Sequence, residues 1–144
     1  MISLLDTPDS RIAEWYCVFL PREPYYRFTH LLKQGFRHIE LTRPIPYGPG
    51  LSDVMWLNLF PNFEMLSADV DMDARPPWIK CPEATIVKVT AARKFLTVRS
   101  WCLIGPMSCV EIVKAALGIR AFWVRTPWQL YKYIRKRGGS IISR

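Results

Sequence analysis

The sequence has no apolar run that reaches the roughly 18 residues of a membrane-spanning helix. Its first residues, Met1 to Asp6, have neither the basic start nor the long apolar core of a signal peptide. We therefore predict neither a membrane span nor a signal peptide. We therefore expect an intracellular location, where cysteine thiols stay reduced.

The chain has few of the side chains that bind metal ions. Its only histidines are His30 and His38, and neither lies near a cysteine in the sequence. The four cysteines lack the C-x-x-C spacing of zinc sites. We therefore predict no metal site and no cofactor, and the spacing supports no particular disulfide. The cysteines are Cys17, Cys81, Cys102 and Cys109.

Acidic residues are missing from the C-terminal part of the chain. The net charge is +8, and the stretch from Leu117 to the end contains no Asp or Glu. This basic segment could bind nucleic acid, an anionic cell-envelope polymer or an acidic protein, or it could be a solvated face. Its basic residues are Arg120, Arg125, Lys132, Arg135, Lys136, Arg137 and Arg144.

Aromatic residues lie between these basic ones. Trp123 and Trp128, together with Tyr131 and Tyr133, could line a stacking surface for nucleic acid. They could equally be packing residues, and the sequence shows no helix-turn-helix or RNP motif. Both interpretations stay open at this point.

The composition is that of one globular domain. Half of the 144 residues are hydrophobic, and we find no repeat and no low-complexity linker. We therefore expect a single domain over residues 1–144, with a short arm at 1–12 and a basic C-terminal tail at 135–144.

Residues that favour β-structure dominate the first two thirds of the chain. They predict strands over residues 13–20, 36–42, 54–60, 85–90 and 95–103, with a further candidate at 63–69. A short amphipathic helix is expected at 24–33, a turn rich in proline and glycine at 44–50, and an exposed loop at 71–82.

The pattern becomes helical after Gly105. Ser108 and Glu111 have the spacing of a capping box, which places Cys109 at the first position of a helix that Gly118 ends. The positive end of that helix would favour a thiolate on Cys109.

A second helix is expected from Pro127, with Thr126 as N-cap and Gln129 closing another capping box. Its apolar side is predicted from Leu130, Tyr133 and Ile134. The fold class is therefore α+β: an antiparallel sheet of about five strands with helices packed against it.

One arrangement of residues could support catalysis. If the helix packs on the sheet, Cys109 could meet His38, and a cysteine–histidine pair is a common way to activate a sulfur nucleophile. Asn58 on the following strand is our candidate for orienting the imidazole, and Glu40 is the alternative. The backbone N–H of Cys109 could contribute to an oxyanion hole. Without the pairing, Cys109 would be an ordinary buried thiol.

Three motifs together resemble a known superfamily. They are Gly-Phe-Arg-His-Ile on a strand, a strand containing Trp56, and Ser-Cys-Val-Glu-Ile-Val-Lys on a helix. In this order they resemble the circularly permuted branch of the NlpC/P60 and papain-like cysteine hydrolases. The closing Thr-Pro-Trp-Gln-Leu-Tyr is similar to small phage-encoded members of this group.

The resemblance implies a papain-like thiol hydrolase with Cys109 as nucleophile, His38 as base and Asn58 as orienting residue. A peptide or amide, such as cell-wall peptide, would be the substrate, and the location would be the host cytoplasm or a phage virion. The chain departs from the pattern at Ser108, where many members have Asn, and it lacks a second histidine downstream of His38.

Two other functions remain open. The domain could be a non-enzymatic virion component or adaptor that contacts other virion proteins. It could also bind nucleic acid, or another anionic partner, through its basic C-terminal segment.

Overall fold

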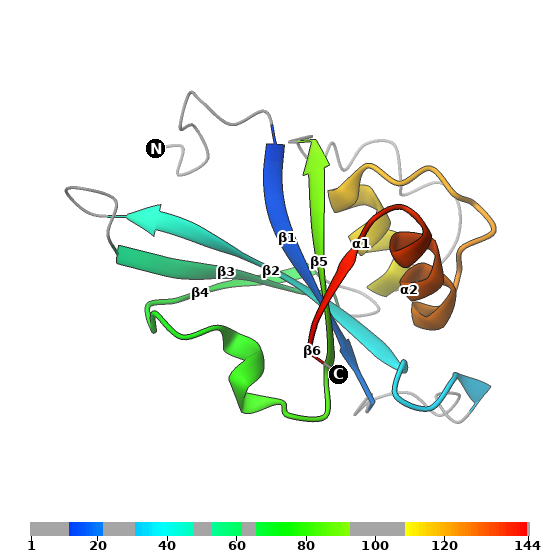
Figure 1. Cartoon of the computed structure of the whole chain (residues 1–144), viewed down its shortest axis with the longest axis horizontal. Helices are drawn as coiled ribbons and strands as arrows, with labels where there is room; N and C mark the ends of the chain where they lie inside the picture. Colours follow the sequence, from blue (N-terminus) through cyan, green and yellow to red (C-terminus); the bar gives the residue numbers. More distant parts are fainter. Residues whose placement is uncertain (1–11, 22–30, 48–52, 62–65, 93–108, 144) are drawn as a thin grey trace.

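Strands form one continuous sheet in the computed structural model, which describes residues 12–21, 31–47, 53–61, 66–92 and 109–143 (Figure 1). Within these ranges the sheet has six antiparallel strands in the order β4-β3-β2-β1-β5-β6. The strands are β1 (Ile12–Leu20), β2 (His38–Tyr47), β3 (Asp53–Pro61), β4 (Leu66–Asp71), β5 (Thr85–Ala92) and β6 (Ser140–Ser143).

Two α-helices and the short 3-10 helix η2 lie among the described residues. They are α1 (Cys109–Leu117), α2 (Pro127–Lys136) and the 3-10 helix η2 (Pro77–Lys80). Figure 1 shows α1 and α2 side by side on one side of the sheet. The predicted α+β class is confirmed, whereas the prediction of about five strands is wrong, because the sheet has six.

Several predicted elements agree with the structure and others lie outside it. The strands expected at 13–20, 54–60 and 85–90 correspond to β1, β3 and β5, and the candidate at 63–69 is shifted to β4. The arm before residue 12, most of the helix at 24–33 and the strand at 95–103 lie outside the described residues.

β2 extends five residues beyond its predicted end, through a stretch with two prolines. Pro44 and Pro46 pair with β3, but the pairing of β2 with β1 stops at Thr42. Beyond Thr42 one edge of β2 therefore has no neighbouring strand in the described residues, and the missing proline N–H breaks no ladder bond there. This explains how a segment predicted as a turn continues as a strand.

The C-terminal residues are not a tail. β6 covers residues 140–143 and pairs antiparallel with β5 through Val87↔Ile141 and Lys88↔Ser140. The predicted tail at 135–144 is therefore wrong for the residues that the structure describes: α2 ends at Lys136, and the chain then returns to the sheet.

The helix boundaries agree with the capping signals. α1 begins at Cys109, and Gly118 ends it with a positive φ of 68°, while the N–H of Ile119 donates to the Lys114 carbonyl at 2.8 Å. This is the geometry of a Schellman motif. α2 has the predicted capping box between Thr126 and Gln129. Ser108, the predicted cap of α1, lies outside the described residues.

Side-chain alternation divides the sheet into two faces. Cys17 and Phe19 of β1 are fully buried and share a core with Ile39, Leu41 and residues of both helices, so we call this the helix face. Val18 lies on the opposite side and packs in a separate cluster, which defines the second face.

Aromatic residues cover the second face. Tyr16, Trp56 and Trp78 contact one another with ring centroids 4.8–5.7 Å apart. Trp78 comes from η2, so this short helix covers the second face of the sheet beside β1 and β3. These two tryptophans are packing residues.

Candidate functional site

Cys109 is the first described residue of α1. The helix packs on the helix face of the sheet against β2 and β3, with Val110 and Val113 fully buried. Cys109 itself is partly exposed and packs against the edge of this core. Its sulfur therefore lies on the helix face, at the helix end whose dipole favours an anion.

His38 lies on the other face. It is the first residue of β2 and pairs with Leu20 of β1, while the next residue, Ile39, pairs with Phe19. Since Ile39 and Phe19 belong to the helix face, alternation directs His38 and Leu20 to the second face. The strand register thus does not bring Cys109 and His38 together, and their catalytic pairing stays a prediction.

Asn58 is engaged elsewhere. It pairs with Thr42 across β2 and β3, and the Thr42 hydroxyl donates a hydrogen bond of 2.6 Å to its side-chain oxygen. Thr42 is four residues beyond His38, which corresponds to roughly 13 Å along an extended strand. The structure therefore does not place Asn58 where it could orient the His38 ring. Glu40, the alternative, does share the second face with His38.

The electrostatics of His38 also differ from those of an activated pair. His38 is only 7% exposed, and burial lowers its pKa from 6.5 to about 4. A thiolate partner would have the opposite effect, because it favours the imidazolium. His38 is therefore a neutral imidazole at pH 7.

The other described cysteines are not activated thiols. Burial raises the pKa of Cys17, which lies in the core of the helix face. Partial burial, and to a smaller extent the charge of Glu40, raise the pKa of Cys81. No group of three or more His, Cys, Asp or Glu side chains that could hold a metal ion occurs among the described residues.

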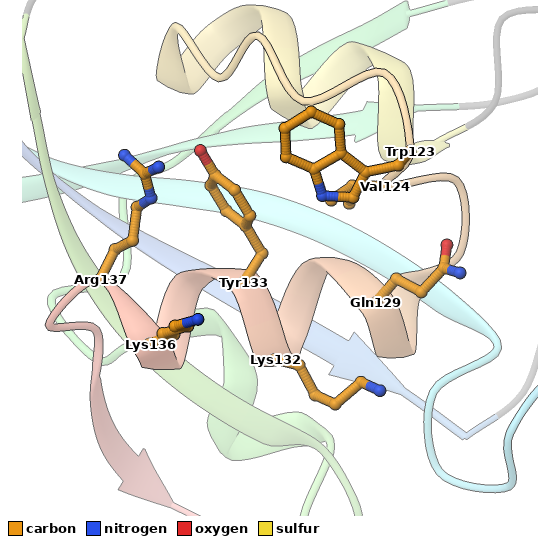
Figure 2. Close-up of a pocket in the computed structure, with 7 residues that line it drawn as sticks. All are labelled: Trp123, Val124, Gln129, Lys132, Tyr133, Lys136 and Arg137. Carbon is orange, nitrogen blue, oxygen red and sulfur yellow. The ribbon is translucent and has the colours of Figure 1, made fainter.

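A groove lies instead on α2, next to the segment that connects α1 to α2. It has a volume of about 560 Å³ and is open to solvent. Figure 2 shows Trp123 and Tyr133 projecting into it, with Arg137 next to Tyr133. We call it the α2 groove. Its lining residues are Trp123, Val124, Gln129, Lys132, Tyr133, Lys136 and Arg137.

The walls of the α2 groove come from two elements. Trp123 and Val124 lie in the segment between α1 and α2, and the remaining five residues lie along α2 and at its C-terminal cap. Those five follow the i, i+3, i+4, i+7, i+8 spacing of a single helix face. The groove is therefore one polar helix face closed on one side by a tryptophan.

The groove combines positive charge with exposed aromatic surface. Lys132, Lys136 and Arg137 are exposed, and the Arg137 guanidinium lies over the Tyr133 ring at 4.7 Å. Trp123 is 59% exposed. No acidic residue follows Glu111 in the chain, so none is present on α2 or on the segment before it.

Glu111 is the acidic residue nearest to this region along the chain, and it is paired. Its carboxylate accepts a hydrogen bond of 2.7 Å from the Lys114 ammonium, which also donates to the Val124 carbonyl at 2.9 Å. The charge of Glu111 is thus offset by Lys114. Of the three cations of the groove, Lys132 lies over the Trp128 ring at 5.7 Å and Arg137 over the Tyr133 ring at 4.7 Å.

The components of the groove are evident from the sequence, but their arrangement is not. Leu130 and Ile134 form the buried side of α2 as predicted, and Tyr133, which is also predicted there, packs half-buried against the same core while lining the groove. The helical spacing of Gln129, Lys132 and Lys136 is the signal that could have identified a polar face. The contribution of Trp123 depends on how the preceding segment folds back.

None of the known protein families has a model that matches the chain, and neither a curated protein nor a solved structure is detectably similar to it. In the described residues, no helix is long and apolar enough to cross a membrane.

Proposed function

We propose that this protein binds nucleic acid through the α2 groove. The observation behind the proposal is the lining of the groove: three exposed cations and two aromatic rings around one open cavity of about 560 Å³, on a segment without acidic residues. Cations that contact phosphates and rings that stack on bases are the two components of sequence-tolerant nucleic-acid binding.

The arrangement fits nucleic acid better than an acidic protein. An acidic protein would need only the charges, and a large solvent-exposed indole such as Trp123 would add little to binding carboxylates. A base offers a flat π-face to Trp123, while the phosphates of the same strand can reach exposed cations along α2. Both kinds of side chain then contribute to the same ligand.

The test is a binding titration with a fluorescently labelled oligonucleotide at low salt. We expect the double variant Lys132→Gln/Lys136→Gln to weaken binding by on the order of tenfold, since each exposed ion pair contributes at most about 1 kcal/mol. Both side chains are exposed, so the fold should be unaffected.

A matched control has the same change in net charge. Arg75→Gln/Lys80→Gln removes two exposed cations near η2, on the second face of the sheet. This control should retain the affinity of the unaltered protein. Equal losses in the two double variants, or no binding at low salt, would contradict the proposal.

A thiol hydrolase, papain-like as the resemblance implies, is the second candidate function. It is favoured by the position of Cys109 at the start of α1, partly exposed, on a helix that packs against the strand beginning with His38. The reaction would require the His38 ring to reach the helix face, which a one-residue shift of β2 would achieve.

Labelling by a thiol-directed reagent near neutral pH tests this candidate. If Cys109 is activated, it should react faster than the exposed Cys81, and the Cys109→Ala variant should lose both this labelling and any hydrolysis of cell-wall peptide. If Cys109 reacts no faster than Cys81, the hydrolase proposal is wrong. Intact biological function in a Cys109→Ala/His38→Ala variant would favour a non-enzymatic virion or adaptor role.

A further inference from the structure

The α2 groove contains more than a patch of positive charge. Trp123 is 59% exposed and the preceding Phe122 is 76% exposed, with their rings in an edge-to-face contact at 5.1 Å. A ligand that presents only phosphates would make no contact with such an apolar surface. The exposed rings therefore indicate which form of nucleic acid the groove binds.

Trp123 is exposed, but the backbone that follows it is anchored. The next residue, Val124, is 2% exposed, and its carbonyl accepts the hydrogen bond from the buried Lys114 ammonium. Beyond Val124, the N–H groups of Arg125 and Thr126 both donate to the side-chain oxygen of Gln129. The indole is therefore presented from a fixed segment, so a stacking partner need not order the backbone first.

The second ring of the groove is held by a contact with a cation. Tyr133 projects from α2, and the Arg137 guanidinium lies over its ring at 4.7 Å. Arg137 also faces the groove, where a stacked guanidinium can contact a base or a phosphate. Trp123 and Tyr133 thus offer two aromatic surfaces within one cavity, whereas Lys132 projects from the other side of α2 (Figure 2).

From these contacts we infer that the groove binds single-stranded nucleic acid, with an unpaired base stacked on Trp123, in preference to a duplex. In a duplex both faces of each base are covered by its neighbours, so the indole would have no base face to contact. In a single strand the faces can be exposed, and the lysines can follow the backbone. This inference rests on the proposed nucleic-acid binding and specifies its ligand.

The experiment compares Trp123→Ala with the unaltered protein, using one labelled oligonucleotide as a single strand and as a duplex. We expect Trp123→Ala to weaken single-strand binding by about 5- to 150-fold, the measured range for losing one stacked base. Duplex binding should change less than about twofold, because phosphate contacts alone contribute to it. The Trp123→Phe variant should restore much of the lost affinity.

The outcomes separate this inference from the proposed function. If Trp123→Ala weakens single-strand and duplex binding equally, or changes neither, stacking is wrong while phosphate binding by Lys132 and Lys136 stands. If the unaltered protein binds neither form at low salt, both are wrong. An RNA strand of the same sequence, tested beside DNA, shows whether the sugar contributes to binding. The stacking inference requires that Trp123→Ala weakens the binding of single-stranded DNA, of single-stranded RNA, or of both.

Discussion

Lys114 shows how a single charged side chain can organise its surroundings. It is 2% exposed, and its ammonium is bound by the Glu111 carboxylate and the Val124 carbonyl. A buried cation is tolerated only when it is paired and hydrogen-bonded in this way. The consequence is structural: the segment between α1 and α2 is tied to the core immediately next to Trp123.

His38 is a second buried polar side chain, and it makes stability depend on pH. Burial lowers its pKa to about 4 in the folded protein, from 6.5. Between these values the unfolded chain binds more protons than the folded one, so stability falls as the pH drops from about 6.5 towards 4. Above pH 6.5 the residue has no such effect.

Replacing this imidazole should therefore flatten the acid side of the stability profile. We expect the free energy of unfolding of the unaltered protein to fall, relative to His38→Gln, by roughly 3 kcal/mol across that window, at about 1.4 kcal/mol per pH unit. Urea titrations at several pH values measure both curves. Parallel curves for the two proteins would show that His38 is protonated equally in the folded and unfolded states.

The turn from α2 to β6 illustrates a constraint between elements. The N–H of Gly139 donates to the Ile134 carbonyl at 3.0 Å, so the chain folds tightly back from the helix to the sheet. A Cβ atom on Gly139 would lie 2.5 Å from a methyl group of Ile134 and 2.9 Å from one of Val87. The close approach of α2, β6 and β5 thus depends on a residue without a side chain.

We expect Gly139→Ala to destabilise the protein by about 1–3 kcal/mol, since the added methyl group overpacks this junction. The neighbouring exposed residue supplies the control: Ser140→Ala should change stability by less than about 0.5 kcal/mol. Thermal or denaturant unfolding measures the difference. Equal stabilities of the two variants would mean that the junction relaxes without cost.

Across the entire chain, the charge is unevenly distributed, and this gives the proposed binding a measurable salt dependence. The three cations of the α2 groove correspond to three phosphate contacts if each binds one. For a single strand, the logarithm of the binding constant should then fall with the logarithm of salt concentration with a slope of about −2. A slope near zero in a titration from about 50 to about 200 mM salt would contradict phosphate binding.

Local patterns were sufficient for the elements whose signals lie close together in the sequence. The capping box at Thr126 and Gln129 and the end of α1 at Gly118 agree with the predictions. These features depend on hydrogen bonds between residues a few positions apart. The same holds for β1 and β5, whose composition alone favours strands.

Other elements depend on pairing between residues that are far apart in the sequence. β6 is short and forms only because α2 returns the chain to β5, and Pro44 and Pro46 can continue β2 because one edge there has no partner strand in the described part of the chain. Neither fact is encoded in neighbouring residues.

The same distinction between local and long-range information applies to the residues of the candidate site. The amino-acid sequence was enough to identify Cys109 at a helix start, His38 on a strand, and the basic and aromatic residues near the C-terminus. Only the tertiary structure showed that His38 pairs with Leu20 and so lies on the face opposite α1, and that Trp123 folds against α2. The physical reason is that a strand register assigns every side chain to a face, and a shift of one residue reverses each assignment.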